Sequence, residues 1–233
     1  MTGGATSNRP VGSPDGSPAG GAFGPPRPAV PGTVGMLGGT FDPIHLGHLA
    51  VADEAREALG LERILFVPAG LPPHKAGRPI TPASDRLAMV ELAIAGNPAF
   101  AASRIELDRP GPSYTVDTVA ALLDGPDAPS ELTVILSVEL FGTLATWHEP
   151  ERLLRLARVA VAPRAGHRPA GRAFLAEHFP GLEDRVTFLD GPHLGVSGTD
   201  IRARAAAGRS IRYLVPPAVA AYIGDHALYT ARP

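Results

Sequence analysis

Short apolar runs alternate with segments of helical periodicity along most of the chain. The runs have the length and the β-branched or aromatic residues of buried strands, while the segments between them repeat apolar positions every three or four residues. Strands are predicted at residues 34–37, 63–67, 101–107, 132–136, 159–162 and 185–189, and helices at 46–59, 84–95, 113–123, 149–156, 170–178, 199–207 and 216–222. This alternation predicts an α/β fold with a doubly wound parallel sheet, whose ligands bind beyond the carboxyl ends of the strands.

The first 33 residues differ from the rest in composition, because they contain eight Gly and seven Pro. Such a segment cannot bury enough apolar surface to offset the entropy lost on ordering. We therefore predict a disordered arm over residues 1–33 and one folded domain over residues 34–233. We expect the arm to be dispensable, and a docking role is the alternative.

The 233-residue chain contains no cysteine, which excludes disulfides, thiolate nucleophiles and cysteine-bound zinc or iron–sulfur clusters. Its formal net charge of −2 argues against nucleic acid as the main partner. No apolar run approaches the ~18–20 residues that span a bilayer, and the N-terminus lacks the charged-then-apolar order of a secretory signal. We therefore expect a cytoplasmic protein that binds neither nucleic acid nor a membrane.

The chemistry concentrates where the first predicted strand meets the first predicted helix, in the segment Gly-Gly-Thr-Phe-Asp-Pro-Ile-His-Leu-Gly-His at residues 38–48. Two glycines let the backbone approach a bulky anion, and the helix that follows offers unpaired N–H groups and a partial positive charge. His45 and His48 are three residues apart and therefore share a face, so we expect both imidazoles to point at a bound phosphate. The segment matches neither the dinucleotide fingerprint nor the kinase-type phosphate loop.

Two other interpretations of the histidine pair are weighed against phosphate binding. A His-x-x-His pair is most often two surface histidines, although its position after a Gly-Gly turn argues against that here. A zinc site, as in a metal-dependent hydrolase, needs a third ligand. The candidates for that ligand are Asp42, His74 and Glu139.

The segment at residues 38–48 resembles the signature of the nucleotidyltransferase superfamily with the H-x-G-H motif and, within it, of the nicotinate-nucleotide adenylyltransferases. The resemblance covers nearly all of residues 34–233. The matching segments that follow are the substrate loop at residues 67–75, the pyridine-side segment at 106–118, the Thr-Trp-His run at 146–148, the second phosphate motif at 196–202 and the C-terminal segment at 210–216.

The resemblance implies a Rossmann-like nucleotidyltransferase domain that joins nicotinate mononucleotide and ATP in NAD biosynthesis. The products are nicotinate adenine dinucleotide and pyrophosphate, and Mg²⁺ is carried by ATP with no metal ligand from the protein. The attacking phosphate monoester has a second pKa of ~6, so it is mostly ionised near neutral pH and needs no general base. The protein then has to align the reactants and stabilise developing charge.

The resemblance also assigns roles to individual residues. The catalytic residues are His45, His48 and Arg202, and Arg202 would hold the β- and γ-phosphates. The remaining ATP-binding residues are Gly38, Gly39, Thr40, Phe41, Ser197 and Thr199, and the nicotinate-nucleotide-binding residues are Lys75, Tyr114, Thr115 and Trp147. The indole of Trp147 suits stacking on a pyridinium ring, and main-chain N–H groups around Tyr114 and Thr115 would prefer a carboxylate to an amide.

The sequence departs from the family pattern at two places. Ser137-Val138-Glu139 replaces Gly-x-Asp, so Glu139 would approach the ribose with a side chain one methylene longer. Gly198 replaces the second serine of the Ile-Ser-Ser-Thr-x-x-Arg motif. The alternative functions are a sister nucleotidyltransferase acting on nicotinamide mononucleotide or pantetheine phosphate, and a non-catalytic nucleotide-binding module. The sequence does not set the oligomeric state, and a homo-oligomer is compatible with it.

Overall fold

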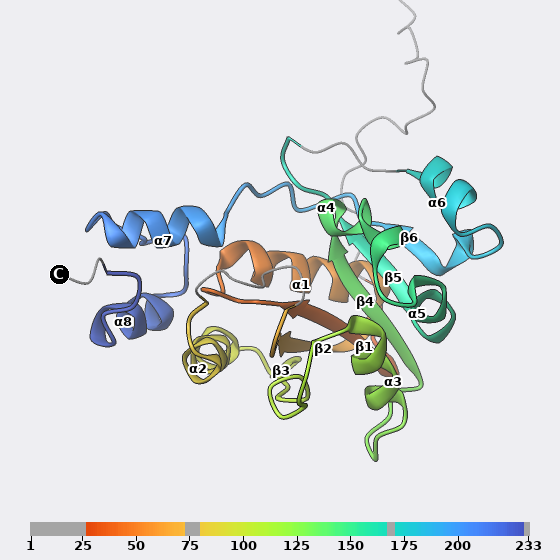
Figure 1. The fold of residues 1–233 in the computed structure, drawn as a ribbon, viewed down its shortest axis with the longest axis horizontal. Coiled ribbons are helices and arrows are strands. Elements are labelled where there is room, and N and C mark those ends of the chain that lie inside the picture. The colour runs from red at the N-terminus through yellow and green to blue at the C-terminus, as the bar shows by residue number, and fades with distance from the viewer. Residues whose placement is uncertain (1–26, 73–79, 167–170, 231–233) are drawn as a thin grey trace, which may run out of the picture.

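The computed structural model describes residues 27–72, 80–166 and 171–230, and in this part of the chain six parallel strands form one sheet between two layers of helices (Figure 1). The spatial order is β3-β2-β1-β4-β5-β6. The strands are β1 (Val30–Gly39), β2 (Leu61–Pro68), β3 (Phe100–Ala102), β4 (Glu131–Ser137), β5 (Arg158–Ala162) and β6 (Val186–Phe188). The predicted α/β class and the doubly wound parallel sheet are confirmed.

The helices that cover the sheet follow the strands along the chain. They are α1 (Leu46–Leu59), α2 (Ala83–Ile94), α3 (Thr115–Leu123), α4 (Val138–Phe141), α5 (Pro150–Leu156), α6 (Arg172–His178), α7 (Gly198–Ala206) and α8 (Pro217–Asp225), with 3₁₀ turns at Leu144–Thr146 and Glu183–Arg185. None of the helices in these described segments is long and apolar enough to cross a membrane.

Each face of the sheet carries its own hydrophobic core, because successive side chains of a strand point to opposite faces. In β4, Val134 and Leu136 pack into the core shared with α3, α5 and α6, whereas Ile135 between them packs into the core shared with α1, α2, α7 and α8. Met36 and Leu37 of β1 divide in the same way. The near-continuous apolar character of the strands therefore reflects burial on both faces.

Strand β1 is longer than predicted and begins at Val30. Its first part is held to β2 by a hydrogen bond of 2.6 Å from the Gly32 N–H to the Glu62 carboxylate, and by one from the Glu62 N–H to the Thr33 hydroxyl at 3.1 Å. Residues 30–33, which composition assigned to the disordered arm, thus belong to the sheet. Their Gly and Pro content concealed a strand that its neighbour stabilises.

The strand predicted at residues 101–107 is wrong beyond Ala102. The last bond to β2 runs from the Ser103 N–H to the Phe66 carbonyl at 2.9 Å, after which the chain turns. The alternating apolar residues that suggested a longer strand surround Glu106, whose carboxylate is buried and accepts a hydrogen bond from Thr118 at 2.8 Å. Helix α4 and the 3₁₀ turns at Leu144–Thr146 and Glu183–Arg185 were not predicted. The helix predicted at 46–59 agrees with α1 at both ends, and, apart from β3, the ends of the other elements differ by at most four residues.

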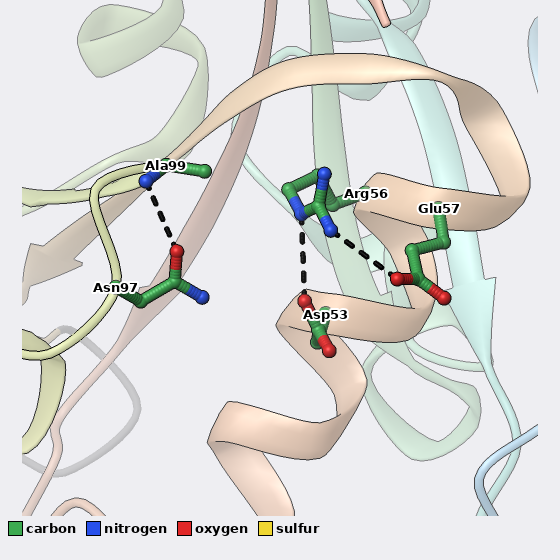
Figure 2. Close-up of polar contacts among 5 residues, drawn as sticks. All are labelled: Asp53, Arg56, Glu57, Asn97 and Ala99. Carbon is green, nitrogen blue, oxygen red and sulfur yellow. Dashed lines mark hydrogen bonds and ion pairs between the residues drawn. The ribbon is translucent and has the colours of Figure 1, made fainter. Parts of the chain in front are cut away.

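The far end of α1 shows contacts that stabilise local structure only. Arg56 contacts Asp53 at 3.4 Å and Glu57 at 3.3 Å, and the Asn97 side chain accepts the Ala99 N–H at 3.0 Å where the chain turns into β3 (Figure 2). Exposed pairs of this kind contribute about 0–1 kcal/mol each. The opposite end of α1, at His45, is where the candidate site lies.

Candidate active site

A cavity of about 640 Å³ opens at the carboxyl edge of the sheet, where β1 and β4 lie side by side. From β1 the chain continues to β2 on one side, and from β4 it continues to β5 on the other. Ligands of doubly wound sheets bind at this kind of switch point, and the volume is typical of small-molecule sites. The cavity is lined by the segments after β1, β2, β4 and β5 together with the first turns of α3 and α7.

The cavity brings together every predicted site residue that the structure describes. These residues are Gly38, Gly39, Thr40, Phe41, His45, His48, Tyr114, Thr115, Glu139, Trp147, Ser197, Thr199 and Arg202. Lys75 and His74 lie outside the described residues. Segments separated by up to about 160 residues therefore share one site, while the binding role of each residue stays a prediction.

The two imidazoles of the H-x-G-H segment stack on each other. Their ring centroids are 3.6 Å apart with an angle of 18° between the planes, and the Phe41 ring meets His48 edge-on. The His45 main-chain N–H donates to Nδ1 of His48 at 3.2 Å. Because Nδ1 accepts this bond, the proton of the neutral ring lies on Nε2. His48 is thereby fixed in the tautomer that can donate from Nε2 to a ligand.

His45 is held as a neutral ring. Its side chain is 7% exposed, and burial together with the nearby Arg164 charge lowers the pKa of His45 from 6.5 to about 4. Gly47 makes room for it, since a Cβ at that position would stand 3.1 Å from Nδ1 of His45. The close approach of the His45 ring therefore explains why a glycine stands in the H-x-G-H segment. The lowered pKa leaves His45 neutral at pH 7, so its ring carries one N–H donor.

The prediction that the first N–H groups of α1 are unpaired is wrong for two of them. The Leu46 N–H donates to the Leu214 carbonyl and the His48 N–H to the His45 carbonyl, both at 2.9 Å. Gly38 is the position that faces open space, because a Cβ there would meet nothing within 4 Å. At this turn, Gly38 leaves open space beside the backbone, whereas the Leu46 and His48 amides of the helix are already bonded.

Arg202 crosses from α7 to the loop after β1. Its Nη1 donates to the Asp42 main-chain carbonyl at 2.7 Å, and its Nη2 donates to the Thr199 hydroxyl at 3.2 Å. Gly198 permits this approach, since a Cβ there would lie 3.2 Å from the Asp42 carbonyl oxygen. The departure at Gly198 is therefore compatible with close packing of α7 on the loop after β1.

The imidazoles lie next to Phe41 and Ile44 of the core on one sheet face, and the part of the cavity lining that packs against the core on the opposite face, its other end, is aromatic. Trp147 is half-buried, packs against the core and donates from Nε1 to the Thr143 hydroxyl at 3.2 Å. The Tyr114 ring lies 4.4 Å from the His148 ring, and Glu149 follows with a positive φ of 46°. A non-glycine residue in this conformation carries strain that the surrounding structure must offset.

The amides at the start of α3 lie beside this aromatic wall. The Tyr114 N–H donates to the Pro112 carbonyl at 3.2 Å, so it is not the amide that a ligand would meet. Thr115 is the first residue of α3, and the first N–H groups of a helix have no partner within the helix. The candidate donor for a carboxylate is therefore the Thr115 N–H.

The segment after β4 departs from the family pattern with a local structural consequence. Ser137 is the N-cap of α4, and its hydroxyl accepts the Leu140 N–H at 3.4 Å. The Glu139 carboxylate accepts a hydrogen bond of 2.6 Å from Nη1 of Arg164, which also lines the cavity. Glu139 thus contributes to the site as one half of an ion pair.

The carboxylates near the cavity are already engaged. Asp42 accepts from the Tyr229 hydroxyl and the Thr81 N–H, Glu106 accepts from Thr118, and Glu139 pairs with Arg164. Among residues 27–72, 80–166 and 171–230, no group of three or more His, Cys, Asp or Glu side chains is placed to hold a metal ion.

Sequence comparison agrees with this geometry. The family model described as Cytidylyltransferase-like matches residues 36–204. A protein of Roseiflexus sp. (strain RS-1), named probable nicotinate-nucleotide adenylyltransferase, is 50% identical over 84% of this chain and 97% of its own length. Proteins with the same name from Symbiobacterium thermophilum and Thermomicrobium roseum are 50% and 48% identical, over 84% of this chain and 94% and 91% of theirs. The chain belongs to the nicotinate-nucleotide adenylyltransferase family.

Solved structures of nicotinate-nucleotide adenylyltransferases share the fold. The Plasmodium falciparum nicotinic acid mononucleotide adenylyltransferase complexed with NaAD aligns with a TM-score of 0.69 at 19% identity, over 84% of this chain and 97% of that one. A putative nicotinate-nucleotide adenylyltransferase from Vibrio parahaemolyticus aligns with a TM-score of 0.62 at 17% identity, over 86% and 96% of the two chains. The Rossmann-like fold is thus common to proteins with low sequence identity.

In this adenylyltransferase-family chain, sequence reasoning assigned no role to Arg164 or His148, two polar residues that line the cavity, although His148 stands in the matching run at 146–148. Arg164 comes two residues after the strand predicted at 159–162, so the rule that ligands meet the carboxyl ends of strands could have found it. His148 follows Trp147 and packs on Tyr114 across the cavity wall, which is a tertiary contact that no local pattern predicts.

Proposed function

We propose that this chain transfers the adenylyl group of ATP to nicotinate mononucleotide, as its family membership implies. The observation that carries the proposal is the single cavity with a stacked imidazole pair at one end and an indole at the other. One such cavity can hold the phosphates of both substrates at the imidazoles and a pyridine ring at the indole. The substrates proposed as its partners are ATP and nicotinate mononucleotide.

The reaction needs alignment more than proton transfer. An oxygen of the nicotinate mononucleotide phosphate attacks the α-phosphorus of ATP and forms a P–O–P bond. The bond from the α-phosphorus to the oxygen that bridges to the β-phosphorus breaks, and pyrophosphate leaves with that electron pair. Since the attacking phosphate has a second pKa of ~6, no base has to remove a proton near pH 7.

The phosphate end stabilises the charge that develops in this step. Nε2–H of His48 and the neutral ring of His45 would donate to the α-phosphate oxygens. Arg202 would hold the β- and γ-phosphates beside the Thr199 hydroxyl and the first turn of α7. Donors fixed in this way before the reaction are the main source of rate in electrostatic catalysis.

The aromatic end would select the pyridine substrate. Trp147 would offer an indole face to the electron-poor ring, and the Thr115 N–H would donate a hydrogen bond to the nicotinate carboxylate. A carboxamide NH₂ in that place would face another donor, which disfavours nicotinamide mononucleotide. We assign Glu139 with Arg164 to the ribose side, and Lys75 to the phosphate of nicotinate mononucleotide.

Mg²⁺ would bind through the phosphates of ATP and neutralise part of their charge. The engaged carboxylates of Asp42, Glu106 and Glu139 support a metal that needs no protein ligand. The cysteine-free sequence supports a reducing compartment, the cytoplasm, as the place of action.

A direct assay tests the proposal. The purified chain with Mg-ATP is offered nicotinate mononucleotide, nicotinamide mononucleotide or pantetheine phosphate in parallel, and pyrophosphate release is measured. We expect the fastest release with nicotinate mononucleotide. Faster release with another phosphomonoester identifies a sister transferase, and ATP binding without release identifies a binding module. Stoichiometric zinc in the purified protein would favour the hydrolase alternative.

A further inference from the structure

Behind the phosphate end of the cavity, a buried polar network converges on Asp42. This residue is 8% exposed, and its carboxylate accepts the Tyr229 hydroxyl at Oδ1 at 2.7 Å and the Thr81 N–H at Oδ2 at 3.4 Å. Its main-chain carbonyl accepts Nη1 of Arg202 at 2.7 Å. Segments from the start of the domain, the entry to α2, helix α7 and the end of the chain thus meet at one residue.

A second arginine joins the same network. Arg86 is 2% exposed and donates to the Thr40 carbonyl at 2.8 Å and to the Thr81 carbonyl at 2.9 Å. Burial lowers the pKa of Arg86, and attraction to Asp42 counters that effect. One carboxylate therefore lies close to two guanidinium groups, of which only Arg202 lines the cavity.

Because other groups bond to the Asp42 carboxylate, Arg202 bonds to the main-chain carbonyl of Asp42 and not to its side chain. A free carboxylate favours a bidentate pair with an arginine, which would neutralise the guanidinium. In the described part of the chain, no ion pair joins Arg202 to an acidic side chain, and its two bonds go to the Asp42 carbonyl and the Thr199 hydroxyl. Among the described residues, the positive charge of Arg202 is thus not balanced by a paired carboxylate at the cavity.

We propose that Tyr229 is a positioning residue for the ATP phosphate site. By occupying Oδ1 of Asp42, its hydroxyl keeps the carboxylate from pairing with Arg202 and leaves the guanidinium available to the β- and γ-phosphates. The residue acts through Asp42 and does not line the cavity itself. This inference rests on the proposed function, because it takes ATP as the anion that Arg202 holds.

The chain offers a matched control in a second tyrosine–aspartate pair. The Tyr222 hydroxyl, on α8, donates to Asp85, on α2, at 2.9 Å. Like the Tyr229–Asp42 bond, this bond joins the C-terminal region to a distant segment, but neither Tyr222 nor Asp85 lines the cavity. Loss of the Tyr222 hydroxyl therefore reports a structural effect without a change at Arg202.

The experiment compares Tyr229→Phe with Tyr222→Phe and the unchanged chain. Calorimetry gives the Kd of Mg-ATP without a second substrate, and steady-state kinetics give both KM values. We expect Tyr229→Phe to raise the Kd and KM of ATP about 10–100-fold, the range of a lost hydrogen bond to a charged group, with the KM of nicotinate mononucleotide within twofold. Tyr222→Phe should leave all three within twofold.

A double-mutant cycle tests whether the effect passes through Arg202. In an Arg202→Ala background, Tyr229→Phe should change ATP binding less than twofold, because the guanidinium it protects is absent. An undiminished effect in that background overturns the inference, as does an equal rise in both KM values or an unchanged Kd in the single variant. Because ATP binding is measured alone, the inference is tested even if nicotinate mononucleotide proves to be the wrong acceptor.

Discussion

The two ends of the cavity are built in different ways. At the phosphate end, the His45 main-chain N–H donates to the His48 ring and the Asp42 main-chain carbonyl accepts from Arg202, while the buried Asp42 carboxylate accepts from Tyr229. At the pyridine end, Trp147 has one side-chain hydrogen bond, to Thr143, and its neighbour His148 is exposed. One end is fixed by polar contacts from distant segments, and the other is an aromatic wall supported by local ones.

The difference fits the roles that we propose for the two ends. Charge develops on the phosphates during transfer, and donors stabilise it best when they need no reorganisation at that moment. A pyridine ring has the same charge before and after the step, so the indole needs only to offer a flat face. We therefore expect changes at the phosphate end to act on turnover and changes at the pyridine end to act on substrate affinity.

The largest expected effect is at His48. His48→Ala removes the Nε2–H donor and should lower turnover about 10²–10³-fold, the usual loss for one preorganised charge-stabilising donor. Steady-state pyrophosphate release measures it. His178→Ala, an exposed histidine on α6 away from the cavity, serves as the control and should stay within twofold. Unchanged turnover in His48→Ala would remove the basis for assigning the imidazoles to the transferring phosphate.

The next effect concerns the stability of the phosphate end against acid. Unfolded His45 takes up a proton as the pH falls through its pKa of about 6.5, whereas the folded residue does so at about 4. Between these values the unfolded state binds more protons, so the free energy of unfolding decreases as the pH falls. The loss attributable to His45 is on the order of 3 kcal/mol by pH 4.

Chemical denaturation at pH 7 and pH 4.5, compared between the unchanged chain and His45→Asn, measures this loss. The asparagine variant cannot titrate, so its stability should fall less steeply over the same interval. Parallel pH profiles for the two proteins would mean that His45 is not buried in neutral form. The comparison uses the difference between the two pH values, so a constant cost of the substitution does not affect it.

The fold could be predicted largely from the sequence because burial on both faces gives the strands unbroken apolar runs, as in residues 132–136. The exceptions arise where tertiary contacts override local pattern. Residues 30–33 pair with β2 despite their Gly and Pro content, and Glu106 is buried in a stretch that alternates like a strand. Neither fact is encoded in the periodicity of the segment itself.

The sequence could name candidate site residues from contiguous motifs, but it could not give the contacts that hold them. The H-x-G-H segment is local, and its stacked rings belong to the N-cap of α1 and to its first turn. The contacts of Arg202 with Asp42 and of Tyr229 with Asp42 span 160 and 187 residues. Such partners are set by the topology of the sheet and by helix packing, which residue spacing does not reveal.

A smaller effect is expected at the pyridine end. Trp147→Ala should raise the KM of nicotinate mononucleotide about tenfold and that of ATP less than twofold, since stacking on an aromatic face contributes about 1–2 kcal/mol. Trp147→Phe keeps an aromatic face and should recover most of the affinity. An equal rise in both KM values for the alanine variant would contradict a stacking role and assign Trp147 to the core.

The smallest effect is expected from removing residues 1–26. Contacts with the folded domain begin at Arg27, whose N–H donates to the Glu57 carbonyl, and continue at Val30, which pairs with Leu61. A longer deletion would therefore cut into β1. The chain from residue 27 onward retains all described cavity residues and should keep turnover and melting temperature unchanged within error. A deletion of residues 1–33 is the matched comparison, and it should lower the melting temperature because it removes the Gly32 and Thr33 contacts with Glu62. A large loss of activity from the shorter deletion would instead show that the arm takes part in the function.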